Sequence, residues 1–270
     1  AMLCGCQRGE KSCRYYSLIL EKSDSPEERA RSIETVRRMH SKDQLKCDND
    51  KVYARFTRAV EKNAKLRPLL IEAQENIGRA SEPLRARAQK LLAKGLGYND
   101  SALVAARVIK IWRLEAAERG KTWLPTEEVV DATARALARV RDGASKAELL
   151  QSLWLSIPDA KQRAKHEDLL IELADADPST QTVEVNLRAM EYLSEMRSQK
   201  DATFDAYVKG LFQKDAAHAE TFGRARLALG TLPPDKVTDR ILSIFQDKNV
   251  EFSKWSKNAG LFDWEWREGP

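Results

Sequence analysis

The four cysteines are the residues whose chemistry is most concentrated along this chain, because all of them lie within the first 47 residues. Cys13 and Cys47 could form a disulfide in an oxidising compartment, which would tie the first helix to the loop before the third. Free thiols are one alternative, and a zinc site built from Cys4, Cys6, Cys13 and Cys47 is another. Their spacing matches no standard zinc motif. The sequence therefore leaves a disulfide and free thiols open and disfavours a metal.

A basic stripe is the second candidate for chemistry. Its first cations recur at i, i+4, i+7 and i+11, which places them on one face of a helix, and others follow on the next elements. Residues 51–100 hold 11 Lys or Arg against five Asp or Glu. The basic stripe consists of Lys51, Arg55, Arg58, Lys62, Arg85, Arg87, Lys90 and Lys94. Such a stripe attracts an acidic protein, nucleic acid or anionic lipid headgroups, although a solvated helix face with scattered counter-charges has the same pattern.

Catalytic and metal-binding signatures are missing from the sequence. His166 and Glu167 begin a zinc-protease pattern, but Leu170 stands where the second histidine is needed. Neither a glycine-rich phosphate loop nor a Gly-x-Ser-x-Gly motif occurs. The acidic residues that follow His166 lack the order of a calcium loop and are typical of a solvated face. We therefore expect a protein that is not an enzyme and that needs no metal or cofactor.

Helices must position these groups. Alanine, leucine, lysine, arginine and glutamate are abundant, glycine and proline are few, and we find no convincing strand pattern. No apolar run is long enough to span a membrane. Apolar periodicity predicts helices over 15–22, 49–63, 66–77, 201–213 and 216–229, and others that begin at Ser25, Thr126, Ser145 and Asp159. Gly143 is expected to end the helix that begins at Thr126.

Residues 81–119 predict the clearest pair of helices. A serine can cap the first helix, and a proline occupies its first turn. Gly95 and Gly97 are expected to end that helix, and Asn99 or Asp100 to cap the second. The second helix carries apolar residues on two sides, so we expect it to be buried between neighbouring helices.

A weak internal repeat runs through these helices. Ser25, Ser81 and Asp159 are each followed, four places later, by Arg-Ala-Arg or Arg-Ala-Lys, and an apolar residue stands eleven places after each cap. Over about residues 15–245 this arrangement resembles HEAT-type repeats. The resemblance implies an all-α fold, an irregular α-α superhelix (a HEAT-like solenoid) of stacked antiparallel helix pairs. The uneven repeat lengths argue against a regular superhelix, and a compact helical bundle is the alternative.

The first residues carry a second resemblance. Leu3-Cys4-Gly5-Cys6 is similar to the end of a bacterial lipobox, in which a small residue precedes the lipidated cysteine. That resemblance implies lipidation of Cys6, and Gln7 in place of aspartate implies the outer membrane. The charged linker and the Tyr-Tyr-x-x-Ile-Leu segment that follow resemble bacterial lipoproteins with HEAT-like repeats. The expected location is the bacterial cell envelope, and a cytoplasmic protein with incidental thiols is the alternative.

Three segments are expected along the chain: an N-terminal linker or lipid-attachment segment over 1–14, a helical-repeat domain over 15–250, and an aromatic C-terminal tail over 251–270. The tail alternates aromatic with acidic residues, which indicates a cap on the last repeat or a docking segment. The expected function is a non-enzymatic scaffold for protein–protein interaction. Its partner would be another protein with an acidic surface, and a lipid anchor would be its contact with a membrane. A HEAT-like nucleic-acid-binding protein that uses the basic stripe is the alternative.

Overall fold

The chain is all-α wherever its structure is described. The computed structural model describes residues 12–176, 183–198, 200–203 and 205–206, and every regular element in these ranges is a helix. The chain divides into two compact units, unit 1 (1–140) and unit 2 (141–270). Cys6, the tail over 251–270 and most of the two helices predicted after residue 200 lie outside the described residues.

Unit 1 is an assembly of amphipathic helices. They are α2 (Cys13–Lys22), α3 (Pro26–Arg38), α4 (Ser41–Gln44), the 3₁₀ helix η1 (Leu45–Cys47), α5 (Asp50–Lys62), α6 (Arg67–Arg79), α7 (Glu82–Leu96), α8 (Ala102–Glu118) and α9 (Glu127–Arg139). The hydroxyls of Ser25 and Ser81 accept hydrogen bonds from backbone N–H groups three residues later, and a proline follows in each first turn. The predicted starts of α3 and α7 are therefore confirmed.

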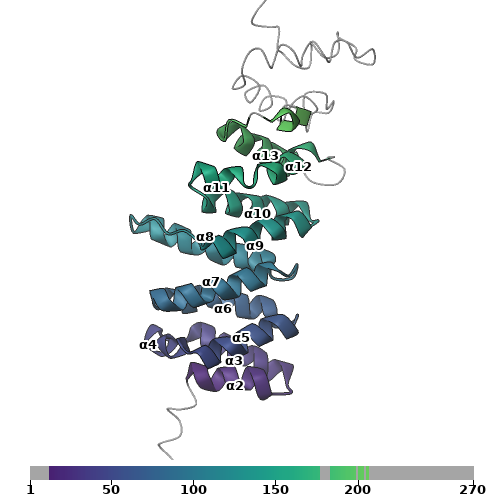
Figure 1. Cartoon of the computed structure of the whole chain (residues 1–270). Helices are drawn as coiled ribbons and strands as arrows, with labels where there is room; N and C mark the ends of the chain where they lie inside the picture. The colour runs from purple at the N-terminus through teal and green to yellow at the C-terminus, as the bar shows by residue number, and fades with distance from the viewer. Residues whose placement is uncertain (1–11, 177–182, 199, 204, 207–270) are drawn as a thin grey trace, which may run out of the picture. The chain divides into compact units, whose positions relative to one another are not determined.

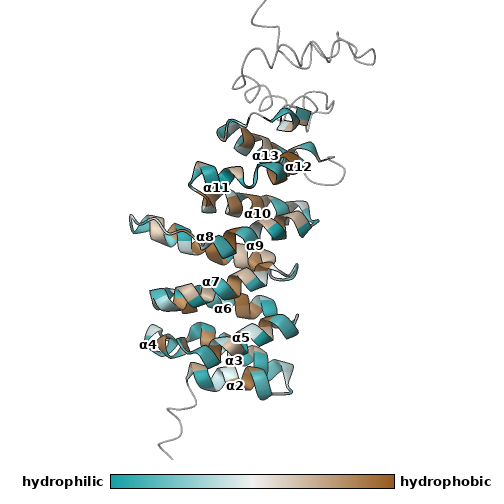
Figure 2. Cartoon of the chain, viewed as in Figure 1, coloured by the Kyte–Doolittle hydropathy of each residue, from teal (hydrophilic) through white to brown (hydrophobic). Residues whose placement is uncertain are grey.

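The helices of unit 1 lie in two rows (Figure 1). In the first row α2, α5, α7 and α9 each pack on the next, and in the second row α3, α6 and α8 do the same. Neighbours in a row run in the same direction. Arg87 near the start of α7 bonds Asp50 at the start of α5, whereas Lys94 near the end of α7 bonds Glu61 at the end of α5. Figure 2 shows that these helices combine hydrophobic and hydrophilic residues, as packing between two rows requires.

Two glycines allow the close approach of helices in this core. A Cβ atom on Gly78 would lie 2.3 Å from Trp112 Cζ2, and one on Gly95 would lie 2.5 Å from Ile71 Cδ1. Gly95 is inside α7, which ends at Leu96 with Gly97 as its C-cap residue, so the predicted helix end is confirmed at Gly97 and wrong at Gly95. Its role is to let α7 approach α6, a tertiary requirement that outweighs its low helix propensity.

The start of α8 also differs from the prediction. Ser101 is its N-cap residue, and the Ser101 hydroxyl donates to a backbone carbonyl of α7 at 2.7 Å rather than capping α8. The Asn99 side chain accepts from Arg139, and Asp100 pairs with Arg67. Neither Asn99 nor Asp100 caps the helix, because arginines from two other elements occupy both side chains.

Burial of α8 is only partial. Ile109 and Trp112 are buried as expected, and Trp112 donates from Nε1 to the carbonyl oxygen of Glu75 at 3.0 Å. Leu114 is 54% exposed, so the last turns of α8 present an apolar side chain to solvent. Among the described residues, no helix has the length and hydropathy to cross a lipid bilayer.

Unit 2 contains α10 (Gly143–Ser156), α11 (Ala160–Ala164), α12 (Glu167–Asp175) and α13 (Val183–Glu195), with α10 and α12 packed on α13. The start predicted at Ser145 is wrong by two residues, because Asp142 accepts the Ser145 N–H and so caps a helix that begins at Gly143. Gly143 therefore begins α10 and does not end the preceding helix. The helix predicted from Asp159 is two helices, α11 and α12, separated at Lys165.

Candidate interaction surface

The basic stripe lies on two neighbouring helices of the first row. Its first four residues belong to α5 and the other four to α7. Because these helices pack side by side in the same direction, the structure brings the two halves of the stripe together. The carboxylates around them decide how much charge the stripe presents.

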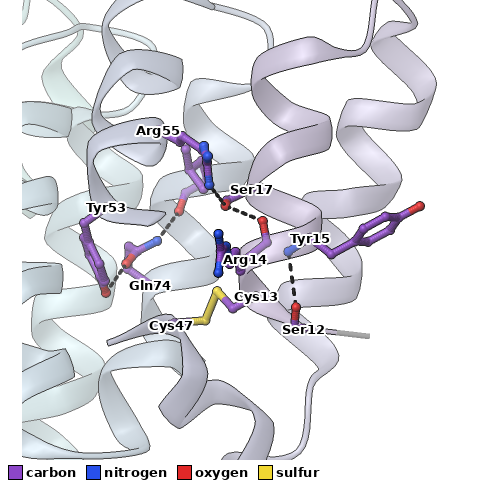
Figure 3. The surroundings of a disulfide bond; sticks show 10 residues. Ser12, Cys13, Arg14, Tyr15, Ser17, Cys47, Tyr53, Arg55 and Gln74 are labelled. Atoms are coloured by element: carbon purple, nitrogen blue, oxygen red, sulfur yellow. Dashed lines mark hydrogen bonds between the residues drawn. A yellow bond between two sulfur atoms is a disulfide. The ribbon is translucent and has the colours of Figure 1, made fainter. Parts of the chain in front are cut away.

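Two arginines of α5 converge on one carboxylate of α2. Arg55 Nε lies 2.9 Å from Glu21 Oε2, and Arg58 pairs with the other oxygen. Arg55 also donates from Nη1 to the Ser17 hydroxyl at 3.2 Å (Figure 3). Hydrogen bonds from Arg55 and then Arg58 hold the pKa of Glu21 below its ordinary value. Glu21 is therefore ionised at neutral pH and neutralises part of the stripe.

Arg87 links α7 to the start of α5. Its Nε lies 2.6 Å from Asp48 Oδ1 and its Nη1 2.5 Å from Asp50 Oδ1. The hydrogen bonds that Arg87 donates to Asp50 and then to Asp48 raise the pKa of Arg87. The guanidinium also lies over the ring of Tyr53, 5.8 Å from its centroid. The Tyr53 hydroxyl donates to Gln74 Oε1 at 3.2 Å (Figure 3), and burial raises the pKa of Tyr53. Arg87 is thus part of the packing between helices.

Of the remaining stripe cations on α7, two have hydrogen-bond or ion-pair partners and one is free within the described part of the structure. Lys94 Nζ lies 2.6 Å from Glu61 Oε1. Arg85 donates from Nε to the carbonyl oxygen of Gly78 at 3.2 Å, and its guanidinium lies 5.7 and 5.9 Å from the centroids of two indole rings. Lys90, in contrast, is exposed and has no such contact among the described residues.

Three lysines of the stripe therefore keep free ammonium groups. Lys51, Lys62 and Lys90 are exposed, and in the described part of the chain their side chains make no hydrogen bond or ion pair. The other five stripe residues are held by carboxylates or carbonyl oxygens of neighbouring elements. The stripe consequently offers fewer available charges than the sequence suggests.

The arginine of the internal repeat has a structural task that the sequence did not reveal. At the fourth place after each repeat cap, its Nε donates to a carbonyl oxygen at the end of the preceding helix: Arg29 to Ser23 at 2.5 Å, Arg85 to Gly78 at 3.2 Å and Arg163 to Ile157 at 2.6 Å. Carbonyl groups in the last turn of a helix lack partners within that helix. The repeat therefore encodes a C-terminal cap supplied by the next helix.

Side-chain contacts between successive helices of a row recur at similar separations in sequence, 33 to 43 residues in unit 1. The ion pairs Lys94–Glu61, Arg37–Glu72 and Arg87–Asp50 join residues 33, 35 and 37 places apart. The bond from Trp112 to Glu75 also spans 37 places, and in unit 2 the bond from Trp154 to Glu195 spans 41. The sequence contains this spacing as pairs of opposite charges. A search for repeated residue types does not find it, because the two partners of each pair differ in type.

The cysteine pair lies at one end of the stripe. Cys13 Sγ and Cys47 Sγ are 2.01 Å apart in a disulfide, with Cα atoms 5.1 Å apart, and both residues are completely buried (Figure 3). Cys13 is the first residue of α2, and Cys47 directly precedes Asp48. The disulfide and the Asp48–Arg87 pair therefore hold the loop before α5 from two sides.

Other candidate groups are engaged in structural contacts. Lys200 Nζ lies 2.6 Å from Asp168 Oδ1 and 3.1 Å from Glu167 Oε2, so part of the acidic run forms ion pairs. In the ranges that the structure describes, no cluster of three or more His, Cys, Asp or Glu side chains could hold a metal ion.

Comparisons with known proteins place the chain in no family. No family model matches it, and no curated protein matches it. A solved structure described as "Computational Design of Self-Assembling Cyclic Protein Homooligomers" aligns over 96% of this chain and 94% of that chain, with 14% sequence identity and a TM-score of 0.18. A TM-score this low supports no argument about fold.

Proposed function

We propose that the chain is a HEAT-like solenoid, an irregular superhelix of stacked antiparallel helix pairs, that serves as a non-enzymatic scaffold and binds another protein. Side-chain contacts between successive helices of a row join residues 33 to 43 places apart in unit 1, and this recurring separation is the observation that carries this proposal. When each helix pair stacks on the one before it, residues one repeat length apart must meet. A compact bundle imposes no such recurring separation.

The contacts within unit 2 support the same repeat. Trp154 donates from Nε1 to Glu195 Oε2 at 3.0 Å across 41 residues, and Arg163 caps Ile157 as its counterparts do in unit 1. Each unit thus uses the same two devices, a side-chain contact to the next repeat and an arginine that caps the preceding helix. Stacked repeats of this kind generate extended surfaces for binding proteins.

The binding surface in this proposal is the exposed side of α5 and α7. Lys51, Lys62 and Lys90 supply three free ammonium groups there. Free cations on a rigid surface favour an acidic partner and speed its association. The ion-paired arginines of the stripe hold the two helices in place and do not contribute free charge.

Nucleic acid binding by the same stripe is the alternative. Tyr53 and Phe56, which lie on α5 between residues of the stripe, are buried and cannot stack on bases. Glu21 and the aspartates at the start of α5 neutralise three of its arginines, which leaves few cations to contact phosphate groups. Protein binding therefore accounts for the surface better.

We also propose that Cys6 attaches the chain to a bacterial envelope membrane through a lipid. The buried disulfide supports this location, because disulfides persist in oxidising compartments such as the periplasm. Metabolic labelling with an alkyne fatty acid tests the anchor. The label should be present on the full-length protein and on Cys4→Ser and absent from Cys6→Ser; an unlabelled full-length protein would contradict it.

The scaffold proposal is tested by photocrosslinking in the native cell. A photoreactive amino acid replaces Lys51 or Lys90 on the first row, and Leu69, which is 41% exposed on α6 of the second row, as the matched control. We expect the same protein adduct from Lys51 and Lys90 and none from Leu69. Adducts from Leu69 alone, or transfer to nucleic acid at Lys51 and Lys90, would refute the assignment.

A further inference from the structure

The face of α5 on which α2 packs carries two arginines of the stripe. We infer that Arg55 and Arg58 form a carboxylate-binding pair that α2 occupies with Glu21, and that reduction of the Cys13–Cys47 disulfide lets an acidic helical segment of the partner protein replace α2. The inference rests on the proposed function, for which it names the class of binding segment and the condition for binding.

The arginine pair has the geometry of a carboxylate site. The two guanidinium groups bind opposite oxygens of one carboxylate, and the Ser17 hydroxyl accepts a further hydrogen bond from Arg55. The Arg55 side chain is only 13% exposed, whereas that of Arg58 is 47% exposed. Planar arginine groups recognise carboxylates through paired, charge-assisted hydrogen bonds. Glu21 therefore shows which chemical group a competing ligand must bring.

α2 packs on α5 and α3 with few fully buried side chains, and its Tyr16, Leu18 and Ile19 are half-buried. Three of its residues are buried, Cys13, Ser17 and Leu20, and Leu20 is the one large aliphatic side chain among them. Tyr15 is 38% exposed and points away from the disulfide in Figure 3. The disulfide at the start of α2, the Glu21 ion pairs near its end and the bond from Arg29 to the Ser23 carbonyl oxygen add to this packing.

Reduction removes the one covalent restraint among these. A thiolate of a dithiol reductant attacks one sulfur of the disulfide, and a mixed disulfide forms as the other cysteine leaves. The second thiol of the reductant then resolves the mixed disulfide, so that Cys13 and Cys47 each take up a proton and the dithiol becomes a disulfide. Both cysteines are completely buried, so attack requires the first turn of α2 to open.

The replacing segment is defined by what α2 contributes. It must be helical, carry a carboxylate for Arg55 and Arg58, and place a leucine-like side chain beside that carboxylate, as Leu20 stands beside Glu21. A surface that binds an acidic amphipathic helix in place of its own helix matches the acidic partner proposed above.

A peptide copy of α2 is the direct probe. Residues 12–24 are synthesised with Cys13→Ser and a fluorophore, and binding to the full chain is followed by anisotropy with and without a dithiol. We expect at least tenfold tighter binding to the reduced protein and to the Cys13→Ser/Cys47→Ser variant than to the oxidised protein. The same peptide with Glu21→Gln should bind at least fivefold more weakly. Equal binding to the oxidised and reduced proteins would overturn the inference.

A variant that keeps the disulfide guards against loss of folding on reduction. Oxidised Glu21→Gln exposes the arginine pair and should bind polyglutamate at least threefold more tightly than the unaltered chain at low salt. Glu72→Gln is the matched control, because it removes an acidic partner of Arg37 and adds the same net charge elsewhere. Equal effects of both substitutions would contradict the arginine site. If the peptide binds in no state while Lys90 still crosslinks to its partner, this inference fails and the proposed function stands.

Discussion

Removing the disulfide should loosen α2 more than any other helix of unit 1. Cys13 and Cys47 are 34 residues apart, and closing a loop of that length restricts the unfolded chain by about 4 kcal/mol in the chain-entropy model. With the disulfide present, α2 cannot leave α5 unless the structure around Cys47 also opens. Without it, noncovalent contacts alone hold α2, and Leu20 is the one large aliphatic side chain among its buried residues.

Hydrogen exchange measured by mass spectrometry reports this opening. If the whole 4 kcal/mol acts on the opening of α2, the hydrogen-exchange protection of its amides falls by roughly 500- to 1000-fold, which is the upper limit. Peptides from α7 provide the internal control, and Cys4→Ser with Cys6→Ser controls for thiol removal. A change in α2 smaller than about threefold, with α7 unchanged, would show that noncovalent contacts alone hold α2 and would refute the reasoning.

Four further predictions follow from the described contacts. Gly78→Ala should lower the free energy of unfolding by about 1–3 kcal/mol in urea titrations, because the new methyl group meets the ring of Trp112. Arg163→Leu should lower it by about 1 kcal/mol, measured the same way, because a helix-end carbonyl loses its cap. Asn186→Ala should lower the free energy of opening α12 by about 1–3 kcal/mol, measured by hydrogen exchange in α12. The reason is that the Asn186 amide donates to three carbonyl oxygens at the end of that helix. Acidification should raise hydrogen exchange in α2. The pKa of Glu21 is lowered in the fold, so its contribution to the stability of α2 is complete above the ordinary glutamate pKa and is lost as the pH falls toward the pKa in the folded state. Glu21→Gln should lack this acid-dependent step.

Local features of the fold could be predicted from the sequence. The caps at Ser25 and Ser81 depend on residues within one helical turn, and periodicity identified the buried stripe that includes Trp112. Gly95 was misinterpreted because its role depends on Ile71, which approaches from another helix. Contacts of this kind require knowledge of which helices are neighbours.

The charge of the candidate surface could not be predicted for the same reason. The positions of Arg55 and Arg58 on one helix face follow from their spacing, but their neutralisation depends on Glu21 in a helix more than 30 residues earlier. Free and paired cations look alike in a sequence. The distinction between Lys90 and Arg87, three residues apart, emerges only when α7 is placed beside α5.

The most direct test of the scaffold account is a titration of the crosslinked partner against two forms of the chain. The partner captured at Lys90 is purified and its Kd is measured over a range of salt concentrations with the unaltered chain and with Lys51→Gln/Lys62→Gln/Lys90→Gln. The account predicts at least tenfold weaker binding by the variant and a shallower dependence on salt, because three free charges are removed. Equal affinity and equal salt dependence in both forms would contradict it.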